Sequence, residues 1–399
     1  MADPQAFAYV YMDPAHRTDR LAASELWIRM ASFRHDTAEV IIQGIDDIDP
    51  TRWTTGTPLR ITYGRSLAAM GEFVGYLLNI NRDWSQVQHA TLPRRTAKIT
   101  AIGASNPLKA DLTNIYTGMT SAQIATTLVE SHYLDRDIPS TSYVWPSRAA
   151  SGTSEWSFLC ELAKASGLVL YCKGTQVRMY DPLTPLKRNN SVVPYFYEHA
   201  SGKGSTVLDF RSDVTEMSAE HGRRKRTRIL RGMDANTGVP FLATDSGPVH
   251  TLATRNLAPS VSESVIDLVA PNQAAATALL PARSVENRFY IRAQARFSGD
   301  ITVTQASPVV IEGLGTRDSG IWQVLEATHH IRKNWFSTDC ELGRDSDYDN
   351  GVRPGLPANV ARARLDPYAT PVLANPPTVL VNGQWRAAWI SPTGAPNGN

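Results

Sequence analysis

The feature that most constrains the fold of this chain is a change of hydrophobic period, from two to about 3.6 and back again. The first hundred residues hold short runs rich in Val, Ile, Tyr and Thr, separated by Gly, Pro and Asp turn residues. Such runs are typical of the strands of a sandwich or barrel. Helical spacing takes over from about Asn106, and strand-like runs resume after residue 205. The chain is therefore predicted to be α+β and mostly β, with a small mixed unit between two β-rich parts.

Two neighbouring runs of the first part predict a hairpin. Residues 26–33 and 38–45 are joined by the short polar segment 34–37, which suits a tight connection. Further strands are expected at residues 58–65, 72–84 and 95–105. The first 106 residues are assigned to one β domain, a sandwich or barrel, on this evidence.

The middle part, residues 107–187, is predicted to hold two helices and a hairpin. Thr120 and Gln123 form a T-x-x-Q capping box, which places a helix start just before Ser121. Ser154 can cap the second helix, and Gly167 supplies the left-handed position that ends it. The apolar residues of that helix follow the spacing i, i+3, i+4, i+7: Trp156, Leu159, Cys160 and Ala163. Residues 168–172 and 175–182 then form the hairpin.

The third part, residues 188–345, is predicted to be again β-rich, with one Ala-rich helix. The helix is expected within residues 271–283, and Pro281 should end or kink it. Strand-like runs lie at residues 206–214, 226–233, 262–270, 287–299, 301–305, 308–315, 319–332 and 337–345. The remainder, residues 346–399, is dense in Pro, Asn and Gly without a sustained period. It is expected to be an extended tail that contact with a neighbour orders.

Charge and composition exclude several classes of function. The 40 Lys and Arg nearly balance the 38 Asp and Glu, for a net charge of +2. This balance argues against bulk attraction to nucleic acid or to an anionic membrane. There is no apolar stretch of about 20 residues and no signal-peptide pattern at the N-terminus. We therefore expect no sequence-specific nucleic-acid partner and no direct membrane anchor. The three cysteines fit neither a disulfide framework nor a metal site, which favours small buried side chains.

A search for catalytic chemistry leads to no active-site residue. The chain has no G-x-S-x-G, no H-E-x-x-H, no Walker loop and no dinucleotide-binding glycine motif between a strand and a helix. His329 and His330 are neighbours in a strand-like run, where adjacent side chains face opposite sides and cannot share a metal. We expect no cofactor and no metal. A rival hypothesis remains, a tail-associated cell-wall hydrolase that would use paired carboxylates, and its candidates are Asp46, Asp47, Asp345 and Asp347.

One concentrated charge stands out, the run HGRRKRTR at residues 221–228. It lacks the interleaved aromatic residues of a nucleic-acid patch. A basic rim or a subunit-contact face is the favoured interpretation, and a lining for a lumen that passes a polyanion is the weaker one. The interface candidates are Arg223, Arg224, Lys225, Arg226 and Arg228, together with the C-terminal tail.

The central segment resembles the baseplate hub proteins of phage tails. This family includes the late control proteins, the hubs of contractile tails and the VgrG spikes of type VI secretion. The resemblance rests on a helix, a short loop, a second helix of the pattern S-x-W-x-F-L-x-x-L-A-x-x-x-G and a hairpin. The residues that match this pattern are Ser154, Trp156, Phe158, Leu159, Leu162, Ala163 and Gly167. A later strand matches loosely, through Gly320, Trp322, Val324 and His329 or His330.

This resemblance covers roughly residues 95–345 and implies two tube-like barrels that flank a small α+β insertion. It implies a structural hub rather than an enzyme, located in the tail of a virion that is assembled in the host cytoplasm. The partners it implies are two further copies in a homotrimer, a tail tube or distal tail protein, a tape-measure protein and a central tip or fibre protein. No lysozyme domain, peptidase domain or β-helical spike follows Asp345, so a wall-cutting role would need another protein. A VgrG-like secretion spike is the alternative within the same family.

Overall fold

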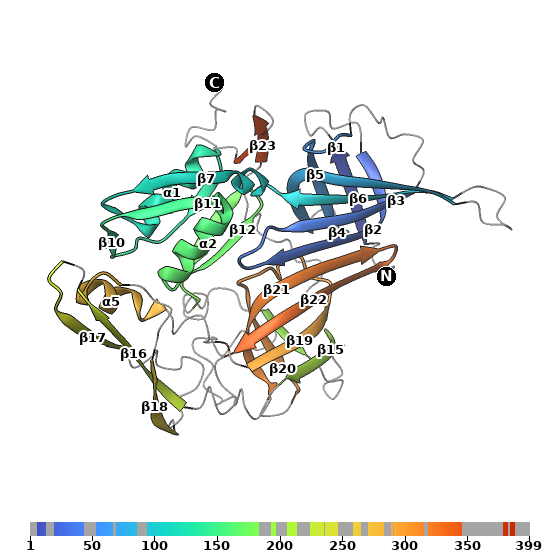
Figure 1. Ribbon diagram of the computed structural model, residues 1–399. Coiled ribbons are helices and arrows are strands. Elements are labelled where there is room, and N and C mark those ends of the chain that lie inside the picture. The colour runs from blue at the N-terminus through green and yellow to red at the C-terminus, as the bar shows by residue number, and fades with distance from the viewer. Residues whose placement is uncertain are drawn as a thin grey trace, which may run out of the picture.

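A computed structural model describes most of the chain (Figure 1). The described residues are 6–12, 20–43, 53–66, 69–85, 94–182, 193–196, 206–213, 224–234, 236–245, 258–264, 270–282, 289, 291–314, 318–344, 378–381 and 384–387. They are mostly β, and their strands gather in a twelve-stranded sheet with several small sheets beside it. The predicted fold class is confirmed.

The first six strands form a closed barrel. They are β1 (Phe7–Met12), β2 (Arg20–Ala31), β3 (Thr37–Gln43), β4 (Pro58–Ser66), β5 (Ala69–Ser85) and β6 (Arg94–Gly103). Their order around the barrel is β1-β4-β5-β6-β3-β2, and β2 pairs back with β1 through Tyr9 and Ala22. Each pairing is antiparallel. The predicted hairpin of residues 26–45 is the β2–β3 pair.

Alternation of side chains explains why this barrel closes. In β3 every second residue is buried, namely Ala38, Val40 and Ile42, so one face of the strand forms the barrel core. The same period runs through β1. Gly75 in β5 allows a close strand approach, since a Cβ built there would lie 2.1 Å from the carbonyl oxygen of Ile102.

The α+β unit follows the barrel. Its elements are η2 (Asn106–Lys109), β7 (Asp111–Tyr116), β8 (Met119–Thr120), α1 (Ser121–Ser131), β9 (Asp135–Asp137), β10 (Val144–Trp145), β11 (Arg148–Ser154), α2 (Glu155–Ala165), β12 (Val169–Lys173) and β13 (Gln176–Tyr180). The strands pair as β7–β11, β8–β10 and the three-stranded sheet β12-β13-β9. The two helices pack into a hydrophobic core that is largely separate from that of the barrels.

Local capping chemistry fixes the ends of both helices, as predicted. The Thr120 hydroxyl accepts the N–H of Gln123, and the Gln123 side chain accepts the N–H of Thr120, which completes the capping box. Ser154 caps α2 in the same way through the N–H of Ser157. Gly167 adopts a φ of 68° after α2, and the N–H of Leu168 donates to the carbonyl of Ala163. This is the Schellman geometry that favours glycine.

The second half of the large sheet repeats the first in a permuted order. Its strands are β14 (Val193–Phe196), β15 (Val207–Asp213), β19 (Ile291–Ser298), β20 (Pro308–Glu312), β21 (Gly320–Arg332) and β22 (Trp335–Arg344). Their spatial order is β14-β20-β21-β22-β19-β15. In that order β20, β21, β22, β19 and β15 take the places that β1, β2, β3, β6 and β5 hold in the barrel. Two differences separate the halves: β14 runs parallel to β20, and no pairing joins β14 to β15 in the described part of the chain.

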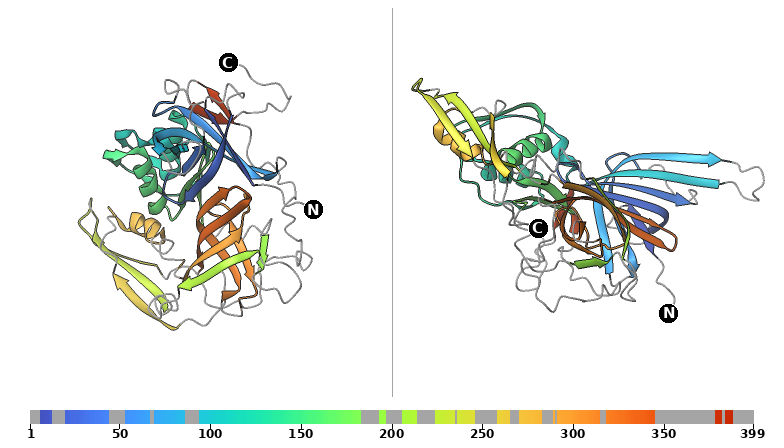
Figure 2. Two further views of the ribbon diagram at one scale, coloured as in Figure 1. Left: turned by 90° about the vertical axis from the view of Figure 1, so that its right-hand side faces the viewer. Right: turned by 90° about the horizontal axis from the view of Figure 1, so that it is seen from below.

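A small module is inserted between β15 and β19. It consists of β16 (Arg224–Met233), β17 (Pro240–Asp245), β18 (Ala258–Ser264) and α5 (Gln273–Leu279), with β16 at the centre of its sheet. The helix begins after Asn272, whose side chain accepts the N–H of Ala275. Figure 2 shows this module and the long β5–β6 hairpin projecting from opposite sides of the molecule. The sequence analysis did not anticipate the module as a separate sheet.

Two of the predicted strands are not found as predicted, and most of the predicted tail lies outside the described residues. Residues 301–305 form turns rather than a strand, because the Asp300 carboxylate accepts the N–H and hydroxyl of Thr302 and holds a local turn. The run at 262–270 overlaps only the end of β18, and residues 265–269 lie outside the described residues. Most of the expected tail, residues 346–399, also lies outside them. Within it, β23 (Thr378–Val381) pairs with β24 (Gln384–Ala387).

Candidate functional site

The feature that joins the two halves of the molecule is one strand pair, β2 with β21. Residues 25–31 of β2 run antiparallel to residues 326–332 of β21, from the pair Glu25–Arg332 to the pair Ala31–Glu326. The remaining part of each strand pairs within its own half of the molecule. Strand β2 pairs with β1 through residues 20–22, and β21 pairs with β20 through residues 320–323. One continuous sheet therefore runs β5-β6-β3-β2-β21-β22-β19-β15.

The inner face of this sheet is apolar across the seam. Leu26 and Ile28 from β2 and Trp322 and Val324 from β21 are fully buried in one core cluster that contains residues of both halves. The Trp322 indole N–H donates to the carbonyl of Asp318, so its polar atom has a partner. Burial of this shared core couples the two halves energetically.

The outer face of the same sheet carries a row of oppositely charged pairs. Arg29 makes a two-pronged contact with Glu326 across the seam, at 2.5 and 2.9 Å. On β19 and β22, Arg296 lies 2.6 Å from Asp339 and Arg292 lies 3.4 Å from Glu341. The hydrogen bond that Arg29 donates to Glu326 raises the pKa of Arg29, and the one that Arg296 donates to Asp339 raises that of Arg296 in the same way. Exposed pairs of this kind contribute little stability each.

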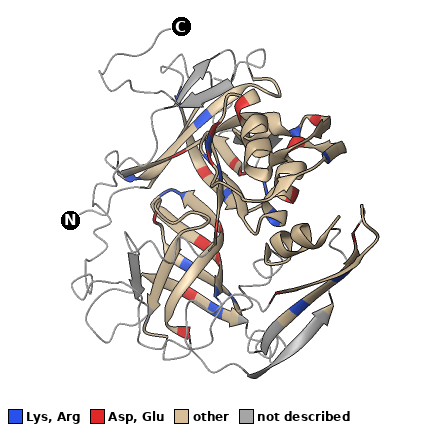
Figure 3. Cartoon of the chain, turned by 90° about the vertical axis from the view of Figure 1, so that its left-hand side faces the viewer, with Lys and Arg blue, Asp and Glu red and all other residues tan. Residues whose placement is uncertain are grey.

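This row makes the outer face almost neutral, although it is densely charged. Blue and red segments alternate along the strands of the second half of the large sheet (Figure 3). A shallow hollow of about 490 Å³ lies over β15, β19, β21 and β22, among these same pairs. On the β2 side, Trp27 stacks on His330 with ring centres 4.7 Å apart, and His330 Nε2 lies 2.7 Å from Glu25.

Among the described strands, the continuous sheet has two open edges, one at the end of β5 beyond Leu77 and one at β15. Beyond Leu77, β5 no longer runs beside β4 and pairs only with β6, and Leu78 is 43% exposed there. At the other end β15 pairs only with β19 among the described strands, and Leu208 is 49% exposed. Open edges present unpaired N–H and C=O groups that can pair with another chain.

The turn between β2 and β3 is the joint at which the three parts of the molecule meet. The N–H of Phe33 donates to the carbonyl of Leu170 in the α+β unit at 2.7 Å. Asp36 is buried, and its carboxylate accepts a long hydrogen bond, 3.5 Å, from Gln305 of the second half. The same Gln305 amide donates to the carbonyl of Cys172 at 2.9 Å. Burial is the main cause that raises the pKa of Asp36 well above its ordinary value.

His35 belongs to the same joint. Its Nδ1 lies 2.8 Å from the hydroxyl of Ser105, and its ring stacks on Trp156 of α2 at 4.6 Å. Burial lowers the pKa of His35 to about 4, and the charge of Lys109 adds to the effect. The joint is therefore held by buried polar groups, in contrast to the apolar seam. Sequence reasoning missed Asp36, Gln305 and Ser105, because only the fold brings them together.

The predicted basic run lies in the inserted module. Arg223 is outside the described residues, and Arg224, Lys225 and Arg226 open strand β16. Arg228 is buried, with 6% of its surface exposed. Among the residues of this strand whose exposure is described, the exposed cation is Arg231, which no sequence pattern singled out. These residues remain interface candidates.

The other candidate residues divide between confirmed and undescribed positions. His329 and His330 face opposite sides of β21 as predicted: His329 is buried beside Thr338, and His330 faces Glu25. Cys172 and Cys340 are buried and Cys160 is half-buried, each as a free thiol. Asp46, Asp47, Asp345 and Asp347 lie outside the described residues. Among the residues that the structure does describe, no group of three or more His, Cys, Asp or Glu is placed to hold a metal.

Comparison with protein families adds a classification to this geometry. The family model described as the Alg8 N-terminal domain matches residues 110–333, which is more than half of the chain. The chain belongs to this family. The match spans most of the α+β unit, the inserted module and the second half as far as β21. No curated protein matches the sequence.

Solved structures share the fold at low sequence identity. The 43 kDa tail protein of prophage MuSo2 from Shewanella oneidensis superposes with a TM-score of 0.57 at 12% identity, over 86% of this chain and all of that one. A tail protein from Neisseria meningitidis gives 0.56 at 11%, over 88% and 98%. The Escherichia coli protein c3393, described as a component of the type VI secretion system, gives 0.53 at 9%, over 88% and 80%. The fold implied by the central motif is thereby confirmed. In the part of the chain that the structure covers, no helix is long and apolar enough to cross a membrane.

Proposed function

We propose that this chain is a structural hub of a phage tail, or of a tail-derived particle, and that it works as a homotrimer. The observation that carries the proposal is the sheet that runs without interruption through both halves and ends in open edges. A protein that only needed to be stable alone would close or cover such edges. The tail proteins that share the fold support a role of this kind.

We infer that the three copies form a ring, because the β5 edge and the β15 edge of one copy differ. The β5 edge of one copy and the β15 edge of the next can pair head to tail, and such a contact builds a ring when the rotation closes. Two similar halves per chain, in three chains, would offer six quasi-equivalent positions. A sixfold tail tube or distal tail protein could seat on one side of this ring, while a central tip or fibre sits on the threefold axis.

The row of paired charges bears on what could pass through the centre of the proposed ring. If the outer face of the sheet lines the ring, its balanced charge would hold neither a polyanion nor a tape-measure protein firmly. The basic strand β16 and the C-terminal tail are then contacts with neighbours outside the ring. The division of the chain at residues 106, 187 and 345 belongs to the same proposal, as does a location in the virion tail. The proposed role is non-enzymatic.

A second function, a VgrG-like secretion spike, is favoured by one observation. The same fold occurs in c3393 and in one chain of a Francisella PdpA–VgrG complex, with TM-scores of 0.53 and 0.51. This chain covers 58% of that second chain, which therefore carries much that has no counterpart here.

The decisive experiment is the mass of the purified protein by light scattering, followed by electron microscopy with added tail-tube protein. The hub proposal expects a mass of three times 43.8 kDa and tube rings capped at one end. Capping of a secretion-system tube instead would select the spike. A chain that stays monomeric at every concentration, with or without tube protein, would contradict both.

A further inference from the structure

The tip of the β16–β17 hairpin carries an apolar cluster without a partner in the described structure. Met233, Val239 and Leu242 are 65, 58 and 54% exposed, and Pro240 lies exposed between them. Met233 pairs in register with Pro240, and Arg231 pairs with Leu242, so these side chains share one face of the hairpin. Three large exposed apolar side chains at one projecting tip are typical of an interaction site.

The opposite face of this hairpin is covered. Leu230 of β16 and Ala243 of β17 are buried against Ala276 and Leu280 of the helical segment. Because neighbouring residues in a strand face opposite sides, Met233 and Leu242 point away from α5. The apolar side chains at the tip therefore lie on the face of the hairpin that is turned away from α5.

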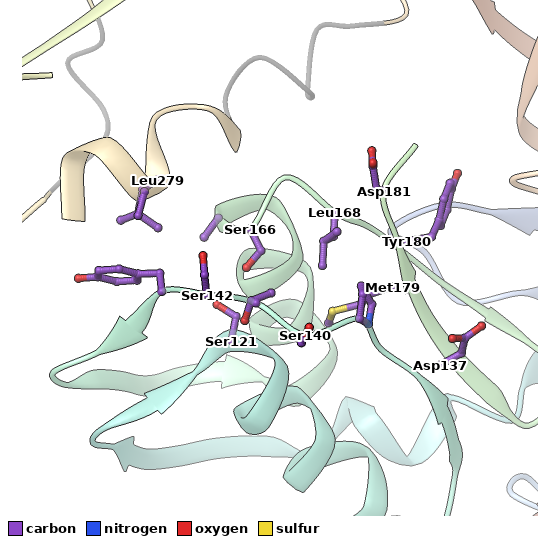
Figure 4. A pocket seen from close by; sticks show the side chains of 15 residues that line it. Ser121, Asp137, Ser140, Ser142, Ser166, Leu168, Met179, Tyr180, Asp181 and Leu279 are labelled. Atoms are coloured by element: carbon purple, nitrogen blue, oxygen red, sulfur yellow. The ribbon is translucent and has the colours of Figure 1, made fainter. Parts of the chain in front are cut away.

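The other side of α5 borders a cleft of about 400 Å³ (Figure 4). The cleft lies between α5 and the α+β unit, and Leu279 of α5 reaches over it. Leu168 and Met179 give its wall an apolar part, and the loop between β9 and β10 adds hydroxyl groups. Among the described residues, its lining includes the carboxylates of Asp137 and Asp181 and holds no Lys, Arg or His.

We infer that the β16–β17 tip of one copy docks into the cleft between α5 and the α+β unit of a neighbouring copy. The inference rests on the proposed trimer and names a contact within it. An apolar tip with one exposed cation, Arg231, matches a cleft with an apolar wall and acidic rim. A chain cannot fill its own cleft in this arrangement, because its tip and its cleft lie on opposite sides of α5. The contact is therefore head to tail, which is the kind that closes a ring.

The charges around the contact are consistent with this match. Asp234 also lies near the tip, but its carboxylate accepts the N–H groups of Asn236 and Thr237 within its own turn. Asp137 lies 3.9 Å from Arg178, at the limit of an ion pair, and its side chain is 63% exposed. It can therefore accept a second cation from a docked tip.

The first test is a matched pair of substitutions, Met233→Ser at the tip and Ile115→Ser on the α+β unit. Both side chains are about two-thirds exposed, so both changes should leave the fold intact. Dilution followed by light scattering should show that Met233→Ser weakens self-association about tenfold or more, as expected for an interface anchor. Ile115→Ser should change it less than about twofold.

A charge exchange tests the direction of the contact. Arg231→Glu and Asp137→Lys should each weaken association, and the double variant should restore it, because the opposite charges then face each other again. Disulfide trapping gives a second readout, from a chain that carries Met233→Cys mixed with a chain that carries Ser142→Cys. Only the mixture should form a covalent dimer under oxidation, since the native thiols are buried or half-buried.

The outcomes separate this inference from the proposed function. A stable trimer that is indifferent to Met233→Ser and to the charge exchange would overturn the docking contact and leave the hub standing. A disulfide within one chain that carries both cysteines, with none between chains, would also overturn it. A monomer at every concentration would remove the trimer and the contact together.

Discussion

The first barrel and the second half of the sheet share a strand layout but differ in closure. In the barrel, β4 and β5 are joined by a short connection and pair at eight positions of β4, which closes the ring. Their counterparts in the second half, β14 and β15, are not paired with each other in the described part of the chain. Closure completes the hydrogen bonding of the first half within one chain, whereas the described second half keeps an open edge. On the proposed function, the closed half serves stability and the open half serves assembly.

The largest expected effect comes from a charge in the strand that both halves share. Ile28→Asp would bury an unpaired carboxylate in the common core, because Ile28 is 1% exposed. We expect a loss of about 4 kcal/mol or more in the free energy of unfolding. Denaturant titration measures it, with Arg29→Gln as an exposed control on the same strand. Survival of protected amides in one half alone would show that the halves are independent.

A matched truncation sharpens the comparison between the closed and the open half. Ile61 in β4 and Ile311 in β20 are both 0% exposed. Ile61→Ala and Ile311→Ala should each cost about 2–5 kcal/mol in the free energy of unfolding. The loss should be larger for Ile61, because a closed barrel relaxes less around a cavity. Equal losses from chemical denaturation would show that closure does not stiffen the first half.

Acid should remove the stability that the two buried neutral histidines contribute. Burial lowers the pKa of His329 to about 3, and that of His35 to about 4. The unfolded chain binds protons at these residues from about pH 6.5 downwards, while the folded chain does not. Their contribution to stability should therefore fall as the pH drops from about 6.5 to 4. Burial raises the pKa of Glu72 in the barrel and that of Asp36 in the joint, and these shifts act in the opposite direction.

Thermal melts between pH 7 and pH 4 test this expectation. His35→Gln keeps a hydrogen-bonding group opposite Ser105 but cannot titrate, so its melting temperature should depend less on pH than that of the unaltered chain. Hydrogen exchange at pH 5 should first release the amides around Phe33. An identical pH dependence in both proteins would remove His35 from the explanation.

The smallest effect is expected at the ion pair across the seam. Arg29 is 49% exposed in its side chain and Glu326 is 22% exposed. A double-mutant cycle with Arg29→Ala and Glu326→Ala should give a coupling of about 0.2–1 kcal/mol that weakens as salt is added. A coupling of several kcal/mol would mean that the charged face, and not the buried core, holds the halves together.

Much of the fold follows from local patterns, and the residues show why. The capping box at Thr120 predicted the start of α1, and the N-cap Ser154 with the stop signal Gly167 predicted both ends of α2 to within a residue or two. The hairpin β2–β3 was predicted from its alternation and its short polar turn. In each case the deciding interactions join residues that are close in sequence, and a sequence displays those directly.

The features that carry the proposed function depend on distant residues. The pairing of β2 with β21, the burial of Asp36 beside Gln305 and the cleft under Leu279 all join segments about a hundred residues apart or more. Residues 301–305 look like a strand because four of the five are β-branched, but the side chain of Asp300 makes them turn. The basic run was found as a pattern, yet its place on the central strand β16 follows only from tertiary pairing.

The seam between β2 and β21 has a consequence for how the chain is made. Arg29 and Glu326 are 297 residues apart, so a ribosome at roughly 10 residues per second needs about half a minute to deliver the second after the first. Strands β1 to β6 are consecutive and can close during synthesis. The half of β2 that later meets β21 stays without that neighbour throughout this interval, and it is an exposed strand edge. During translation this short stretch, residues 25–31, is where a chaperone would have most to protect.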